Sequence, residues 1–295
     1  MSEPEPAEDD WDFYPCRVDG APASIFLNLA LEQRPWPPEA DMLYTVTLHM
    51  LDAGEHGMGT SAEAGVIGPA EDALATSAAS LGLVYVGRLR TKRIWQLMLY
   101  GPPGQLEALG ELTQRSDELR SRRAETQERP DGDHEVFRDF LLPDAERRQW
   151  MQDRRLVDVL LSYGDRLEVP RRIEHWAYFP SHDARERFVL ETARVGFREI
   201  EAADGEHDEP DEPNEHGEHD EHGEHAEHDS EREGEVNGCA DGRGGAARFA
   251  AHVGRIDTVE LAHIHGVVMQ LHAMAQRHGG TYDGWETSIE AALDN

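Results

Sequence analysis

Apolar positions in the first half of the chain recur mostly at every second residue, which is the spacing of a half-buried strand. Strands are therefore expected in a hairpin over residues 11–31, which turns at Asp19-Gly20-Ala21-Pro22, and over residues 42–51, 83–89 and 94–100. A spacing of four at Ala70, Leu74 and Ala78 predicts a helix over residues 69–81 that begins at Pro69, and residues 105–112 predict another. These elements predict one α+β domain with an antiparallel sheet over residues 8–140.

The middle of the chain contains a charged segment and then two apolar-periodic segments. Residues 116–133 are polar and charged, and they predict a linker or an exposed loop. Residues 135–142 predict a short strand, and Pro143 then opens a helix over residues 144–163, where apolar side chains recur at helical spacing. A second domain is expected from residue 145 to residue 295.

The pattern of this second domain alternates between strand and helix. Strands are expected over residues 171–179, 197–200, 247–253 and 281–289, and helices over residues 182–194 and 258–278. Ser181 and Asp257 are the expected N-cap residues of the two helices. The order β-α-β-β-α-β predicts a ferredoxin-like split βαβ sandwich, with one antiparallel sheet and both helices on one of its faces.

The acidic net charge of the chain argues against a nucleic-acid partner. The chain has 60 acidic and 28 basic residues and a net charge of −32, half of which lies between residues 201 and 235. Direct nucleic-acid binding is not expected, because it requires Lys and Arg to replace counterions on the phosphates. There is no apolar run long enough for a membrane span and no secretory signal, and the two cysteines form no disulfide framework. These features predict a cytoplasmic protein.

A histidine repeat dominates the acidic segment. Five histidines recur at every third residue, namely His216, His219, His222, His225 and His228. Low apolar content and high charge predict a disordered insertion over residues 203–243. Three roles remain open for it: a solvated spacer, a docking segment for a basic surface, or a weak and heterogeneous site for Zn²⁺ or Ni²⁺. No fixed cofactor is expected.

Motifs of the second domain carry a resemblance to a known family. Ile173-Glu174-His175 on the first strand, a helix closed at Gly196, and the terminal run Tyr282-Asp283-Gly284-Trp285-Glu286-Thr287 resemble the regulator of ribonuclease E activity B family over residues 145–290. The resemblance implies a ferredoxin-like fold and a protein that binds ribonuclease E and lowers its activity without being a nuclease. In the enterobacterial-type members the acidic segment is a C-terminal tail, whereas here it lies between the second and third strands.

The first domain also resembles a family. Trp11, Tyr14, Gly20, the strand over residues 42–51, and the strand pair from Gly87 to Tyr100 are similar to a domain family of unknown function that is often fused upstream of the regulator. This resemblance implies no activity, so the role of the first domain stays open.

Aromatic residues on two strands are the candidate partner-binding residues, because aromatic side chains dominate interface hot spots. They are Trp176 and Tyr178 on the first strand of the second domain, and Tyr282, Asp283, Gly284 and Trp285 on its last strand. The alternative is structural, with Trp285 in the core and Asp283-Gly284 forming a bulge.

Enzymatic activity is not expected. The sequence has no phosphate-binding loop, no nucleophile elbow and no zinc-binding helix motif. His263, His265, His272 and His278 of the last helix are expected to be boundary residues. The sequence therefore predicts a non-catalytic regulator that binds a protein partner, ribonuclease E being the candidate. The alternative function is metal binding by the histidine repeat, and the oligomeric state stays open.

Overall fold

The computed structural model describes residues 8–200 and 249–291. Contacts divide the chain into two compact units, Met1–Gln152 and Asp153–Asn295, and the division falls inside helix α4 (Ala145–Ser162). Within the described residues, no helix has the length and hydropathy that crossing a bilayer requires.

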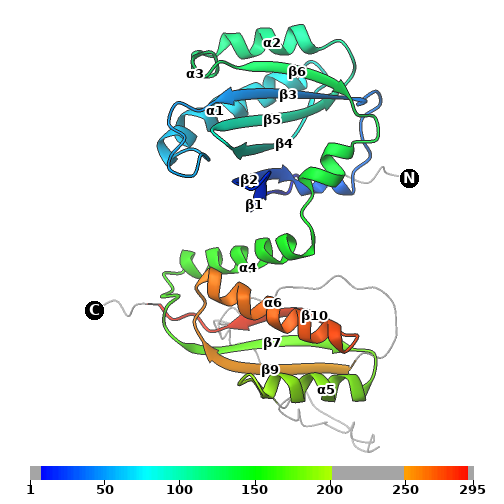
Figure 1. Ribbon diagram of the computed structural model, residues 1–295, viewed down its shortest axis with the longest axis vertical. Helices are drawn as coiled ribbons and strands as arrows, with labels where there is room; N and C mark the ends of the chain where they lie inside the picture. The colour runs from blue at the N-terminus through cyan, green and yellow to red at the C-terminus, as the bar shows by residue number, and fades with distance from the viewer. Residues whose placement is uncertain (1–7, 201–248, 292–295) are drawn as a thin grey trace, which may run out of the picture. The chain divides into compact units, whose positions relative to one another are not determined.

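The first unit contains a six-stranded sheet in which all neighbours are antiparallel, as predicted (Figure 1). The order across the sheet is β1-β2-β4-β5-β3-β6. The bounds are β1 (Trp11–Val18), β2 (Ala21–Asn28), β3 (Met42–His49), β4 (Val84–Thr91), β5 (Ile94–Gly101) and β6 (Glu125–Pro130), with a short 3₁₀-helix, η1 (Leu29–Glu32), after β2.

Three helices pack on one face of this sheet: α1 (Ser61–Ala79), α2 (Leu106–Arg115) and α3 (Asp117–Ser121). The prediction that α1 begins at Pro69 was wrong, because Thr60 caps the helix by accepting a hydrogen bond from the backbone N–H of Glu63. Pro69 lies inside the helix. The carboxylate of Glu63 pairs with Arg122 in the core, which fixes the first turn of α1 beside α3.

Two further predictions for this unit were wrong. Residues 116–133 are not a linker, because they contain α3 and the edge strand β6, which pairs with β3. Residues 135–142 contain a π-helical turn, η2 (Val136–Leu141), instead of a strand. Asp131 accepts hydrogen bonds from the backbone N–H groups of Glu135 and Val136, so it caps this turn on the sheet face opposite α1.

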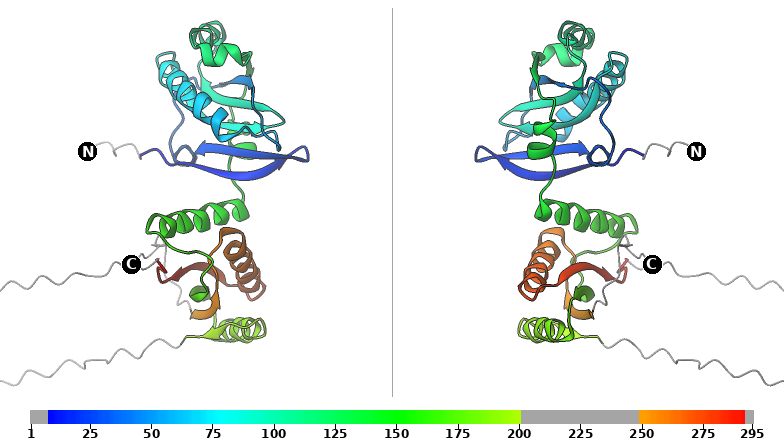
Figure 2. Two further views of the ribbon diagram at one scale, coloured as in Figure 1. Left: turned by 90° about the vertical axis from the view of Figure 1, so that its left-hand side faces the viewer. Right: turned by 90° about the vertical axis from the view of Figure 1, so that its right-hand side faces the viewer.

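The second unit has the predicted split βαβ topology, with an antiparallel sheet in the order β10-β7-β9-β8. Its strands are β7 (Arg171–Phe179), β8 (Arg198–Glu199), β9 (Phe249–Asp257) and β10 (Thr281–Thr287), and its helices α5 (His182–Ala193) and α6 (Leu261–Arg277) lie on the same side of the sheet (Figure 2). Ser181 caps α5 as predicted. The prediction for Asp257 was wrong, since this residue ends β9 and α6 begins at Leu261.

Candidate partner-binding face

Strand β7 separates two kinds of side chain. Ile173, His175, Ala177 and Phe179 are buried beneath the helices, while the residues between them point to the opposite face because side chains alternate along a strand. Trp176 and Tyr178 therefore share one face, as predicted, and both are half-buried. Among the described residues of this unit, α4, α5 and α6 all pack on the other face, so the face of Trp176 is called here the helix-free face.

A charged network orients Trp176 on the helix-free face. Its indole stacks on the imidazole of His252, the residue directly opposite on β9, with ring centroids 4.4 Å apart. Nε2 of His252 lies 2.7 Å from Oε2 of Glu174, and Nε of Arg172 lies 2.8 Å from Oε1 of the same carboxylate. These contacts hold His252 in place beside Trp176, so the stack on the imidazole fixes the position of the indole.

The terminal motif is divided between the core and the surface. Tyr282 and Trp285 are 6% and 8% exposed and pack beneath the helices, whereas Asp283 is exposed. The pairing of β10 with β7 shifts between Tyr282 and Gly284, so Asp283 is the extra residue of a bulge. The bulge turns both aromatic side chains to the same face. The predicted bulge at Asp283-Gly284 and the predicted core position of Trp285 are therefore confirmed.

Polar groups anchor the two buried aromatic residues. The hydroxyl of Tyr282 lies 2.9 Å from Nδ1 of His175, and burial raises the pKa of Tyr282 well above its usual value. Burial likewise lowers the pKa of His175 to about 3, so its imidazole is neutral at pH 7. Tyr282 and Trp285 are therefore core residues of the sheet, whereas Trp176, Tyr178, Asp283 and Gly284 are at least partly exposed.

Asp153 is a central residue of the domain that the sequence patterns did not single out. Its carboxylate is 1% exposed, accepts a hydrogen bond from Nε1 of Trp285, and lies 2.8 Å from Nδ1 of His265. The only sequence signal was an acidic residue on the inner side of an amphipathic helix, a position that normally holds an apolar side chain. His263 and His278 pair with Asp257 and Glu191 at the ends of α6, in keeping with boundary positions.

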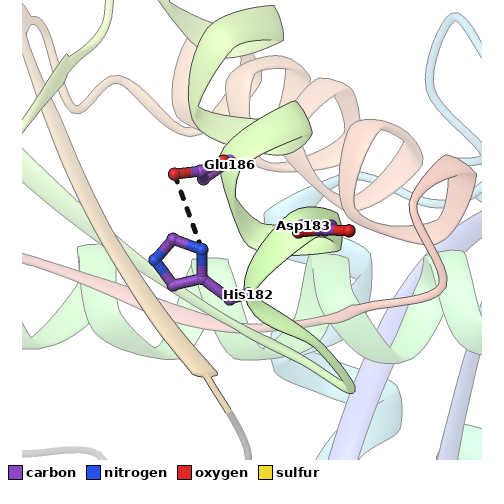
Figure 3. Close-up of side chains that lie close together, drawn as sticks. All are labelled: His182, Asp183 and Glu186. Carbon is purple, nitrogen blue, oxygen red and sulfur yellow. Dashed lines mark ion pairs between the residues drawn. The ribbon is translucent and has the colours of Figure 1, made fainter.

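The predicted metal ligands His216, His219, His222, His225 and His228 lie outside the described residues. One group of metal-ligand type occurs within them, at the first turn of α5, where His182, Asp183 and Glu186 are all exposed. Figure 3 shows His182 turned toward Glu186, with Nδ1 3.5 Å from Oε1. One ligand atom from each of the three residues lies within 4.8 Å of the others. An exposed i,i+4 pair of this kind is a common feature of helix surfaces.

Each of the two units matches a known protein family. Residues 150–287 match the family described as Regulator of ribonuclease activity B, and residues 9–142 match a family of unknown function, DUF695. Each half of the chain thus matches the family that its sequence was predicted to resemble. No curated protein matches the chain. The regulator family covers all four strands of the second sheet and all of α5 and α6, so the helix-free face belongs to the matched region.

Proposed function

We propose that the chain is a cytoplasmic, non-catalytic regulator that binds ribonuclease E and lowers its endonuclease activity. The match of residues 150–287 to Regulator of ribonuclease activity B is the observation that carries this proposal. The name of this family describes an effect on ribonuclease activity, and an effect of this kind requires a contact surface on the regulator.

The helix-free face supplies a surface of the right kind. It presents two half-buried aromatic side chains, Trp176 and Tyr178, on a central strand that is hydrogen-bonded on both sides. Aromatic side chains on rigid elements lose little conformational entropy on binding, so they contribute strongly to affinity. The stack of Trp176 on His252 holds the indole in place before the partner arrives.

The test is an inhibition assay with purified ribonuclease E and a fluorogenic RNA substrate. The full chain is expected to slow cleavage, and Trp176→Ala is expected to raise the concentration needed for half-inhibition about 30-fold, as for a hot-spot loss of about 2 kcal/mol. Leu190→Ala is the matched control, because Leu190 is an exposed apolar residue of α5 in the same domain. Thermal unfolding of each variant checks that the fold is retained.

Two results would contradict the proposal. Cleavage that proceeds unchanged at saturating concentrations of the chain removes ribonuclease E as the target. Equal inhibition by wild type and Trp176→Ala removes the helix-free face as the docking surface.

A further inference from the structure

A hollow of about 590 Å³ interrupts the helix-free face at Gly254 of β9. Gly254 lies opposite Glu174 on β7 and opposite Arg198 on β8, so the hollow sits toward the β8 edge of the sheet. A Cβ atom at this position would lie 2.8 Å from Cδ1 of Ile200 and 3.1 Å from the carbonyl oxygen of Ile173. The absence of a side chain therefore lets Ile200 lie directly against the sheet and form one wall of the hollow.

The hollow has apolar walls that stay accessible. Ile256 of β9 lines it with 64% of its surface exposed, and Ile200 is half-buried beside it. A single exposed isoleucine is ordinary on a protein surface. Two isoleucines around a hollow of this size form a place where an apolar side chain of a partner can be removed from water.

One cation at the hollow is available to a partner. The charges around it are mostly compensated: Arg172 pairs with Glu174, Arg255 with Asp257, and Glu199 with Arg185. Arg198 is exposed and forms no ion pair within residues 8–200 and 249–291. In a chain with a net charge of −32, this hollow is therefore a local site for a negatively charged group.

We propose that the hollow binds an acidic segment of the partner protein, with an apolar side chain of that segment between Ile200 and Ile256 and an adjacent carboxylate on Arg198. This inference rests on the proposed function, because it specifies which part of the partner the helix-free face receives. A carboxylate fits Arg198 because the guanidinium offers paired donors to two oxygens. A basic segment would meet the like charge of Arg198. A nucleic-acid backbone needs several cations to replace its counterions, whereas Arg198 is the one cation outside an ion pair among the described residues that line the hollow.

Selection from a random peptide library displayed on phage tests this inference without assuming the identity of the partner. The full chain is the bait, and enriched peptides are expected to carry Leu or Phe next to Asp or Glu. Fluorescence anisotropy with the most enriched peptide, made synthetically, then compares variants. Ile256→Asp and Arg198→Glu are each expected to weaken binding at least about tenfold, the effect of losing about 1.4 kcal/mol.

Matched controls come from helix α5, on the other face of the sheet. Leu190→Asp alters a residue with the same 64% exposure as Ile256, and Arg187→Glu alters another exposed arginine. Both controls are expected to bind the peptide like wild type. A charge swap sharpens the result: a peptide with Lys in place of its acidic residue is expected to bind Arg198→Glu more tightly than it binds wild type.

The outcomes separate this inference from the proposed function. It is overturned by a selection that enriches no acidic-apolar peptide, or by a peptide that binds Ile256→Asp and Arg198→Glu as tightly as wild type. The same two variants in the ribonuclease E assay complete the comparison. Peptide binding that depends on both residues, without inhibition of ribonuclease E, supports the hollow and removes the enzyme as its target. If both variants inhibit ribonuclease E as strongly as wild type does, the hollow is not the binding site, and the proposed function still stands.

Discussion

The indole Nε1 of Trp285 donates a hydrogen bond of 3.0 Å to the carboxylate of Asp153, which is almost completely buried. The same carboxylate lies 2.8 Å from Nδ1 of His265. A single acidic residue of α4 thus joins the last strand and the last helix of the C-terminal domain. A buried carboxylate is stable only when such partners replace its water shell.

Removing this carboxylate should weaken the C-terminal domain. Asp153→Ala leaves the indole N–H of Trp285 without its acceptor and removes the contact with the half-buried His265, so we expect a loss of about 3 kcal/mol in the free energy of unfolding. Asp153→Asn keeps an acceptor oxygen and should lose less. Chemical denaturation followed by tryptophan fluorescence measures both. Asp158→Ala, at an exposed position of the same helix, should change stability by less than about 1 kcal/mol; wild-type stability of Asp153→Ala would refute the anchoring role.

Glu71 is a buried, hydrogen-bonded carboxylate of the first unit, as Asp153 is of the second. Its buried carboxylate accepts hydrogen bonds from Tyr85, Arg88 and Trp95, at 2.6, 2.6 and 2.5 Å. Glu71→Ala should destabilise this unit by about 3–5 kcal/mol, because it leaves a guanidinium of β4 without its carboxylate. Hydrogen exchange followed by mass spectrometry should show lost protection in β4 and β5. Asp72→Ala, at the next and exposed position of α1, should keep the wild-type pattern; equal protection in both variants would contradict the prediction.

The buried imidazole of His175 should make the C-terminal domain sensitive to acid. Burial lowers its pKa to about 3 from an ordinary value of 6.5, so the unfolded chain takes up a proton first as the pH falls. The contribution of neutral His175 to the free energy of unfolding is complete above pH 6.5 and is lost as the pH falls toward 3. Between pH 6.5 and 5 the loss is about 2 kcal/mol. Unfolding free energies at pH 7.5 and pH 5 should therefore differ by about 2 kcal/mol more in wild type than in His175→Gln. Identical differences would mean that His175 does not carry this sensitivity.

The histidine repeat makes a separate prediction about metal. Under the alternative function, calorimetric titration of the full chain with Zn²⁺ or Ni²⁺ should release heat that is lost when His216, His219, His222, His225 and His228 are replaced by Gln, and also when residues 203–235 are deleted. Binding should weaken at pH 5.5, because protonated imidazole cannot hold a metal. Equal heats for wild type and both variants would remove the repeat from metal binding.

The C-terminal fold was predictable because its local signals agree with its tertiary contacts. Ser181 begins α5, Gly196 follows it with φ +92°, and the alternation along β7 separates its two faces. The burial of Tyr282 and Trp285 was harder to foresee, since residues three apart on a regular strand face opposite sides. Only the bulge at Asp283, a tertiary feature of the pairing with β7, brings them to one face.

The misassigned elements of the first unit have physical reasons of their own. Strand β6 is an edge strand with mostly exposed side chains, so its sequence, ETQERP, shows no apolar alternation and resembles a loop. The start of α1 did carry a signal, since Thr60 and Glu63 have the spacing of a capping box, but Pro69 is the stronger local cue. Asp153 and Gly254 could not be ranked among many acids and glycines, because their importance depends on neighbours distant in the sequence.

The backbone N–H of Ile200 donates a hydrogen bond of 2.9 Å to the carbonyl of His252, which closes the sheet just where the chain leaves β8. Strands β8 and β9 are therefore held together by their own pairing, whatever length of chain joins them. The entropic cost of closing a loop rises slowly with its length, by about 0.6 kcal/mol for each doubling. Added length at this junction therefore costs the sheet little, so a fluorescent reporter or an affinity tag can be inserted here without separating β8 from β9.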